Sequence, residues 1–168
     1  MEPLVDTVLE DDRWGGLGLE ALADRAVRAA LMVLGLPEVG LTVCVMGCDD
    51  ARIAVLNAEF RGKPLPTNVL SWPAWDLAPE EPGAVPEAPD LGSAEEPESL
   101  GDIALAYETC TAEAAAAGRS AGDHVSHLVV HGLLHLLGYD HLTDPDAARM
   151  EGLEVRILAT LAIPDPYG

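Results

Sequence analysis

The hydrophobic residues of this chain follow two spacings, one typical of helices and one typical of buried strands. Within residues 19–34, Leu22, Ala26, Ala29 and Val33 recur every three or four positions, as on one face of a helix. Residues 39–46 are apolar and rich in β-branched side chains, which predicts a strand. By the same criteria we expect strands at residues 4–9, 68–72 and 103–107, and helices at residues 50–60, 109–117, 124–137 and 145–161.

Residues 76–98 interrupt this pattern with eight acidic residues, five prolines and no basic residue. Such a composition cannot bury apolar surface, so we expect a mobile acidic loop inserted in a single domain that spans residues 1–168. The segment is either a solvated insertion without a function of its own or a lid near a functional site.

The whole chain is strongly acidic, with 29 Asp and Glu residues, 9 Lys and Arg residues and a formal net charge of −20. A field of this sign repels RNA, DNA and anionic membranes. Proteins that bind nucleic acids usually have a basic face. A polyanionic substrate would therefore need a local positive pocket on this molecule.

The three cysteines, Cys44, Cys48 and Cys110, are odd in number and irregularly spaced, which does not fit a disulfide framework. Cys44 and Cys48 are expected to be core thiols rather than metal ligands. No apolar run approaches the roughly 20 residues that a membrane span requires, and the first residues do not resemble a secretory signal. We therefore expect a cytoplasmic protein with no membrane partner.

Three histidines gather at the end of the apolar helix predicted at residues 124–137. His131 and His135 are four residues apart, so they share one face of the helix. Gly138 can end the helix through a positive φ, after which His141 can turn back toward the pair. Three imidazoles with open coordination positions are typical of a catalytic metal site, and zinc is the expected ion. A purely structural histidine cluster is the alternative.

Other polar residues near this motif have two interpretations. Asp140 is either a carboxylate that orients a ligand imidazole or a plain turn residue. His124 and His127 lie upstream on the same helix. His127 is four residues before His131 and could line the site, but a core or surface role is the more ordinary one for both. Gly132 stands where zinc proteases of the metzincin kind, which share the histidine spacing, need a glutamate as the general base.

A second motif, at residues 56–72, contains Arg61 and Lys63, two of the few basic residues. The planar guanidinium of Arg61 can bind a phosphate through several donors. An ordinary surface arginine is the alternative, and Asn68 and Ser71 can be ordinary polar groups at a strand edge.

Taken together, these motifs resemble the YbeY family of bacterial metal-dependent endoribonucleases, also called rRNA maturation factors. Residues 131–141 match the family signature His-Gly-x-Leu-His-Leu-x-Gly-Tyr-Asp-His at every fixed position. Leu56, Asn57, Arg61 and residues 66–72 resemble a second conserved block, in which phenylalanine is commoner than tryptophan at Trp72, and residues 101–103 resemble a third. Met150 and Glu154 fall where the family's last helix has Met and Glu. The resemblance extends from about residue 41 to residue 161, and the long acidic segment departs from it.

The resemblance implies an α+β fold, with a small mixed four-stranded sheet packed by about five helices and a metal site at the end of a central apolar helix. It implies zinc (Zn2+) bound by His131, His135 and His141, with Arg61 near the metal and implicated in catalysis. The implied function is single-strand endoribonuclease activity in small-subunit ribosomal RNA 3′-end maturation and ribosome quality control. The implied partners are this RNA, ribosomal proteins and a ribosome-associated GTPase.

Two other functions stay open at the level of the sequence. A metal-dependent hydrolase of another bond, such as a peptide, explains the histidines and the acidity but not Gly132. A ribosome-assembly binding module with a structural metal would keep its partner contacts after the histidines are replaced. The general base and the nucleophile, whether water or the 2′-hydroxyl of RNA, are not defined by the sequence.

Overall fold

One mixed sheet of four strands organises residues 3–167, the part of the chain that this computed structural model describes. The strand order is β1 (Val5–Leu9), β2 (Leu41–Cys48), β4 (Glu98–Ala106) and β3 (Val69–Pro73). β1, β2 and β4 run parallel to one another, whereas β3 pairs with β4 in the antiparallel direction and forms one edge of the sheet. The mixed four-stranded sheet expected from the sequence is confirmed.

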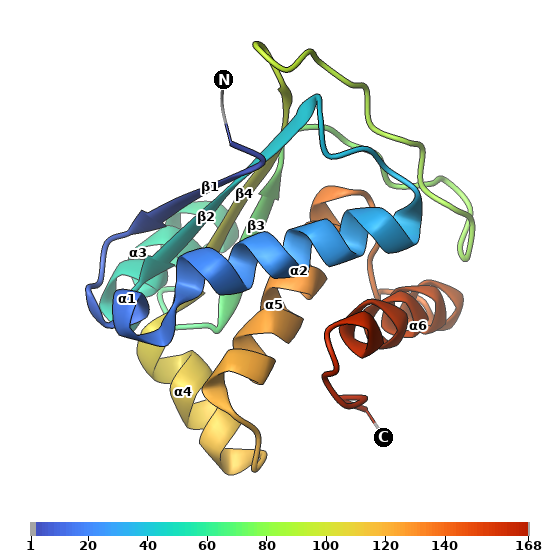
Figure 1. Ribbon diagram of the computed structural model, residues 1–168. Helices are drawn as coiled ribbons and strands as arrows, with labels where there is room; N and C mark the ends of the chain where they lie inside the picture. Colours follow the sequence, from blue (N-terminus) through green and yellow to red (C-terminus); the bar gives the residue numbers. More distant parts are fainter. Residues whose placement is uncertain (1–2, 168) are drawn as a thin grey trace.

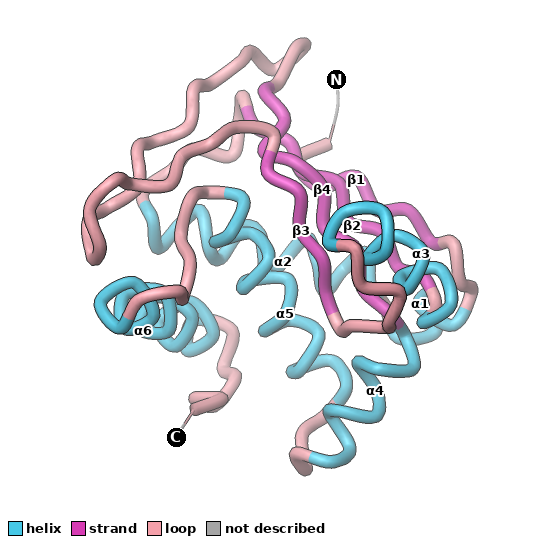
Figure 2. Tube along the Cα trace, turned by 180° about the vertical axis from the view of Figure 1, so that it is seen from behind, coloured by secondary structure: helices cyan, strands magenta, loops and turns pink. Residues whose placement is uncertain are grey.

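Six helices pack around this sheet within residues 3–167. They are α1 (Arg13–Leu17), α2 (Leu19–Leu34), α3 (Asp50–Arg61), α4 (Tyr107–Ala116), α5 (Ala121–Leu136) and α6 (Asp144–Thr160). α2 and α5 cross one face of the sheet, α3 lies against the other face, and α6 packs on α2 and α5 (Figures 1 and 2). No helix in this part of the chain is both long and apolar enough to cross a membrane.

Side chains alternate between the two faces of the sheet and build two cores. The larger core lies between the sheet and the helices α2 and α5, and its strand residues include Val43, Val45, Ile103 and Leu105. The smaller core lies under α3 and consists of Cys48, Ile53, Leu70, Ala104 and Ala106. Each face therefore has its own apolar layer, but the coverage is incomplete, because Cys44 and Met46 of β2 are only half-buried and most of the edge strand β1 is exposed.

Most boundaries shift from those expected by no more than three residues, such as the start of α5 at Ala121 rather than at residue 124, and two elements differ more. The short helix α1 was not predicted, and it is fixed by Trp14, whose buried Nε1–H donates to the Cys48 carbonyl at 2.8 Å. β4 begins at Glu98 rather than at residue 103, because its polar first residues pair with β2, where Glu98 is opposite Leu41.

The acidic segment is attached to the body of the molecule. The backbone N–H of Gly83 donates to Asp146 Oδ1 at 2.7 Å, and Arg149 Nε donates to the Gly83 carbonyl at 2.9 Å. The expectation that residues 76–98 bury no apolar surface is wrong for Pro89, which is buried. The segment lacks regular structure up to Glu98, but side chains at the start of α6 hold its backbone.

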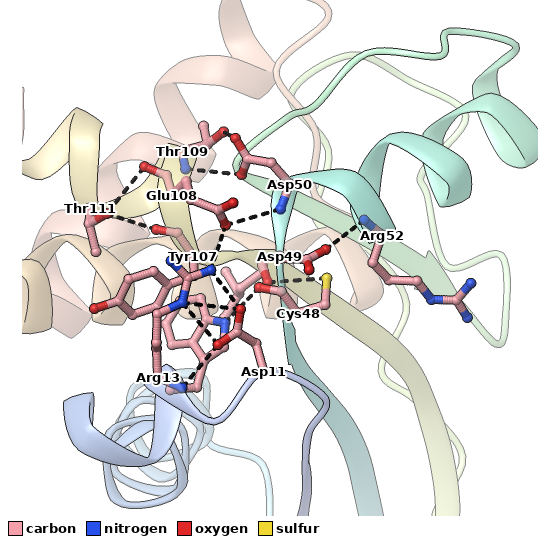
Figure 3. Close-up of polar contacts among 12 residues, drawn as sticks. Asp11, Arg13, Cys48, Asp49, Asp50, Arg52, Tyr107, Glu108, Thr109 and Thr111 are labelled. Carbon is pink, nitrogen blue, oxygen red and sulfur yellow. Dashed lines mark hydrogen bonds and ion pairs between the residues drawn. The ribbon is translucent and has the colours of Figure 1, made fainter.

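Reciprocal caps join the helices that follow β2 and β4 (Figure 3). Asp50, at the start of α3, accepts hydrogen bonds from the backbone N–H and the hydroxyl of Thr109 at 3.0 and 2.8 Å. Glu108, at the start of α4, accepts from the Asp50 N–H at 3.2 Å. Asp49 completes the first turn of α3 by accepting from the Arg52 N–H at 2.7 Å. These carboxylates satisfy N–H groups that have no partner within their own helices.

Candidate metal centre

Helix α5 positions the first two histidines of the motif. It begins at the cap Ser120, whose hydroxyl accepts from the Asp123 N–H at 3.1 Å. Its leucines and valines are buried against the sheet and α2, while His131 and His135 are only half-buried. The expectation that the two imidazoles share one face near the end of an apolar helix is confirmed.

The turn after α5 depends on Gly138, which has a φ of 101°. A Cβ at this position would also lie 2.6 Å from the carbonyl oxygen of Leu77, at the start of the acidic segment. A side chain here would therefore be strained by the backbone conformation and would collide with a neighbouring backbone. The turn brings the exposed His141 back beside the helix.

The three imidazoles meet in an arrangement that fits a metal ion. One ligand nitrogen from each of His131, His135 and His141 lies within 4.8 Å of the others. The Nε2 atoms of His131 and His135 are 3.2 Å apart. Ligand bonds of about 2.0–2.1 Å in a tetrahedral site place neighbouring nitrogens roughly 3.3 Å apart, close to this separation. The cluster could hold a metal ion, and its role as the ligand set stays a prediction.

Glu154 of α6 orients one of these imidazoles, a role that the sequence did not reveal. Its side chain is fully buried, and Oε1 lies 3.2 Å from His131 Nδ1 and 2.6 Å from His127 Nε2. The Tyr167 hydroxyl donates to the same carboxylate at 3.0 Å. Because the ionised carboxylate accepts a hydrogen bond from His131 Nδ1–H, the lone pair of Nε2 is left for a metal.

Burial and hydrogen bonding act in opposite directions on Glu154. Burial raises the pKa of this carboxyl group, but hydrogen bonds from His127 and His131 outweigh it and lower the pKa to about 2. The group is therefore ionised at neutral pH. His127 thus helps to hold the carboxylate that orients His131, and it is not an isolated core or surface residue.

His135 is kept neutral by its surroundings. Burial, together with the neighbouring charges of His131 and His141, lowers the pKa of His135 to about 4. The ring therefore carries no proton on its second nitrogen at neutral pH, which is the state that binds a metal ion.

Asp140 and Arg61 are not members of the histidine cluster. Asp140 accepts a hydrogen bond from the Leu142 N–H at 3.1 Å, which fits the interpretation as a turn residue. Arg61 is the exposed last residue of α3, and α3 lies on the opposite face of the sheet from α5 (Figure 2). Within residues 3–167, no hydrogen bond or ion pair joins the Arg61 guanidinium to the histidines. Its catalytic role stays a prediction.

Two open pockets flank the histidine cluster. One, of about 360 Å³, is lined by residues that include His131, His141, Glu154 and Tyr167. The other, of about 380 Å³, is lined by His135, Gly138 and Asp140 and by residues 73–78. The first residues of the acidic segment therefore form a wall beside His135, so part of this segment lies where a lid would lie.

Comparison with known proteins identifies the family. The family model described as Endoribonuclease YbeY matches residues 14–162. The chain belongs to the YbeY family. This confirms the resemblance inferred from the histidine signature and from the motif around Arg61.

Curated YbeY relatives cover almost the whole chain. The Endoribonuclease YbeY of Dinoroseobacter shibae is 61% identical, over 97% of this chain and 90% of that protein. The Endoribonuclease YbeY of Cereibacter sphaeroides is 60% identical, over 99% of this chain and 100% of that protein. The solution structure of TM1509 from Thermotoga maritima is 19% identical, with a TM-score of 0.55, and covers 94% of this chain and 91% of that one. This last likeness supports the fold alone.

Proposed function

We propose that this YbeY-family chain is a zinc-dependent endoribonuclease that cleaves single-stranded RNA. We further propose that it acts in the cytoplasm on the 3′ end of small-subunit ribosomal RNA and in ribosome quality control, with ribosomal proteins and a ribosome-associated GTPase as partners. The observation that carries the proposal is the three-imidazole cluster supported by Glu154, in a chain whose relatives are named endoribonucleases.

The residues of the chain have separable tasks in this reaction. His131, His135 and His141 would hold a divalent ion, which would supply Lewis-acid chemistry at a phosphoryl group. Glu154 holds the His131 ring in place, and Gly138 permits the turn that brings His141 to the cluster. Arg61 would bind phosphate and stabilise the charge that develops on it. The exposure of His141 and the open pockets on both sides give an RNA strand access to the cluster.

The environment of Gly132 argues against the peptidase alternative. Gly132 is buried, and a Cβ at this position would lie 3.2 Å from two side-chain carbons of Ile103 in the sheet. A side chain at residue 132 would therefore press on Ile103 in the core, which would have to shift to admit it. Gly132 itself offers no proton acceptor where the metzincin mechanism requires one.

The direct test is cleavage of a labelled single-stranded RNA by the purified chain and by His135→Ala prepared in the same way. We expect the parent to cut and the variant to lose both metal and cleavage. Equal cleavage by the two proteins would reveal a contaminating nuclease. If neither cuts, and ribosomal partners still bind His135→Ala, the binding module with a structural metal replaces the proposal.

A second comparison tests Arg61. Arg61→Ala should lower the cleavage rate by at least about tenfold and leave the metal content unchanged, because the guanidinium contacts phosphate and not the metal. Arg25→Ala, which removes an exposed arginine of α2, is the matched control and should cleave normally. Equal loss of metal and cleavage in Arg61→Ala would contradict the assigned role.

A further inference from the structure

An open pocket lies on the face of the sheet that carries α3, opposite to the face covered by α5. It has a volume of about 280 Å³, and its lining includes Cys44, Met46, Leu56, Phe60, Trp72 and Asp102. Three of these residues form one row across the sheet, because Asp102 of β4 is paired with Cys44 of β2 on one side and with Trp72 of β3 on the other. We call the site formed by Met46, Leu56, Phe60, Trp72 and Asp102 the base pocket.

Two aromatic rings form one side of the base pocket. The ring centroids of Phe60 and Trp72 are 4.8 Å apart with an interplanar angle of 59°, and Phe60 is 61% exposed. Phe60 is thus an exposed ring packed on the half-buried Trp72, and exposed apolar side chains at the rim of a hollow are typical of a binding surface. Ligand pockets usually measure roughly 300–1,000 Å³, so this pocket suits one small planar group.

Two basic residues lie beside Phe60 in the sequence rather than in the lining of the base pocket. Arg61 directly follows Phe60, and Lys63 comes two residues later; both are exposed. Within residues 3–167, neither forms an ion pair, whereas Arg13, Arg28 and Arg52 are each paired with carboxylates.

Asp102, an exposed residue in the lining of the base pocket, presents a carboxylate that accepts hydrogen bonds and repels phosphate. Burial raises the pKa of the neighbouring Cys44 thiol, and the negative charge of Asp102 adds to this effect. A ligand that fits the base pocket therefore combines an apolar ring that carries a donor with a phosphate that stays outside.

We propose that the base pocket binds one nucleobase of the RNA substrate. The inference rests on the proposed function and names a binding site for that substrate. The base stacks on Phe60 and Trp72, as bases do on aromatic side chains in proteins that bind single strands. An exocyclic amino group of adenine, cytosine or guanine donates to Asp102, and an adjoining phosphate binds Lys63, while Arg61 remains for the phosphate that reacts at the metal centre. Uracil has no such amino group and binds more weakly.

Strand β3 connects the base pocket to the metal centre. Trp72 lines the base pocket, and the next residue, Pro73, lines the pocket beside His135. Successive side chains of a strand point to opposite faces, and β3 is the edge of the sheet, so no further strand separates the two sites. A single RNA strand that curves around this end of β3 meets both sites.

The test is an NMR titration of the metal-loaded chain with AMP, CMP and UMP, which contain no phosphodiester bond to cleave. Ribose 5-phosphate is the probe for phosphate alone. The indole N–H signal of Trp72, identified by its loss in Trp72→Leu, should shift with AMP and CMP, less with UMP, and not with ribose 5-phosphate. The buried indole of Trp14, which is bonded to Cys48, should stay unchanged and serves as the internal control.

Variants of the lining residues extend the test, with thermal unfolding as the check that each one folds. Phe60→Leu should weaken AMP binding at least about fivefold, since stacking on an aromatic side chain contributes roughly 1–3 kcal/mol per base. Trp72→Phe keeps an aromatic ring and should still bind AMP. Because this variant lacks the indole, binding is followed by the backbone amide signal of Asp102. Asp102→Asn should reduce the preference for CMP over UMP. Val55→Ala, on the exposed surface of α3 outside the pocket, is the matched control.

The outcomes separate this inference from the proposed function. If no nucleotide shifts the Trp72 signal, or if ribose 5-phosphate shifts it equally, the base pocket is overturned even when the chain cuts RNA in the paired assay. If AMP shifts the signal in a chain that cuts no RNA, the nucleobase site is supported and the endoribonuclease proposal fails instead.

Discussion

The buried carboxylate of Glu154 decides which nitrogen of His131 faces the metal position. Glu154→Gln removes the negative charge that accepts the His131 Nδ1–H, while the size of the side chain is kept. Loss of such a partner typically lowers metal affinity about 10- to 100-fold. We expect a decrease of this size, measured by competition for zinc with a chromophoric chelator.

Two controls accompany the Glu154→Gln measurement. Glu20→Gln removes an exposed carboxylate of α2 and should bind zinc like the parent. Thermal unfolding of the metal-free proteins shows separately how much Glu154 contributes to the fold through His127 and Tyr167. An unchanged zinc affinity in a folded Glu154→Gln protein would show that His131 needs no anionic partner.

His135 makes the stability of the metal-free chain depend on pH. The pKa of His135 is about 4 in the folded chain, against 6.5 for an unperturbed histidine. Burial and the charges of His131 and His141 disfavour its protonation. Between these values the unfolded chain binds a proton that the folded chain does not, so the free energy of unfolding falls as pH is lowered from about 6.5 to about 4. Urea unfolding at several pH values across this range measures this change in the free energy of unfolding. His135→Asn should have a flatter dependence, and an identical slope would exclude His135 as the cause.

At the scale of elements, the reciprocal caps stabilise the starts of α3 and α4 (Figure 3). Asp50→Ala removes two hydrogen bonds to Thr109 and should lower the free energy of unfolding by about 1 kcal/mol, within the usual range of roughly 0.5–2 kcal/mol for a cap. Denaturant unfolding measures the change. Asp12→Ala is the matched control, because Asp12 stands at the cap of α1 without a side-chain hydrogen bond. Equal losses in the two variants would contradict the role assigned to the caps.

Elements that carry their own end signals were predicted well from the sequence. α2 begins and ends where its apolar spacing predicts, with Gly35 at a φ of 72° after its last residue. α3 begins after the cap Asp49 and ends at Arg61, one residue beyond the expected end, with Gly62 at a φ of 68° after it. These signals are local, because each residue satisfies or releases the backbone of its own helix. Pairing between strands joins residues that are far apart in the sequence, as β4 and β2 are. For this reason the sequence did not predict the first half of β4.

The same distinction applies to the candidate site. The three histidines could be predicted to meet because one helix turn and one glycine set their geometry within a short stretch. Glu154 reaches His131 from another helix, so its role depends on tertiary packing. A signal was present in the sequence: Glu154 is a carboxylate on the helix face formed by the buried Met150, Ile157 and Leu158. A lone acid in an apolar stripe requires a buried partner.

At the scale of the whole molecule, the net charge of −20 opposes RNA binding while a few local cations favour it. Repulsion by the acidic surface acts over distance, and salt screens it with a Debye length of about 8 Å at physiological ionic strength. Contacts of phosphates with Arg61 and Lys63 are short-ranged, and salt weakens them through counterion release. Raising the salt concentration therefore weakens the contacts and relieves the repulsion at the same time.

The salt dependence of RNA binding should consequently be shallow. Each phosphate neutralised on a single strand contributes a slope of about −0.7 to log K against log salt, so two contacts give a slope no steeper than about −1.4. Fluorescence anisotropy of a labelled single-stranded RNA with the cleavage-deficient His135→Ala chain measures this slope. Replacing Arg61 and Lys63 together by alanine should bring it to zero or make it positive, because only the screened repulsion then remains. A slope steeper than about −3 in the His135→Ala chain would instead require a basic surface well beyond these two residues.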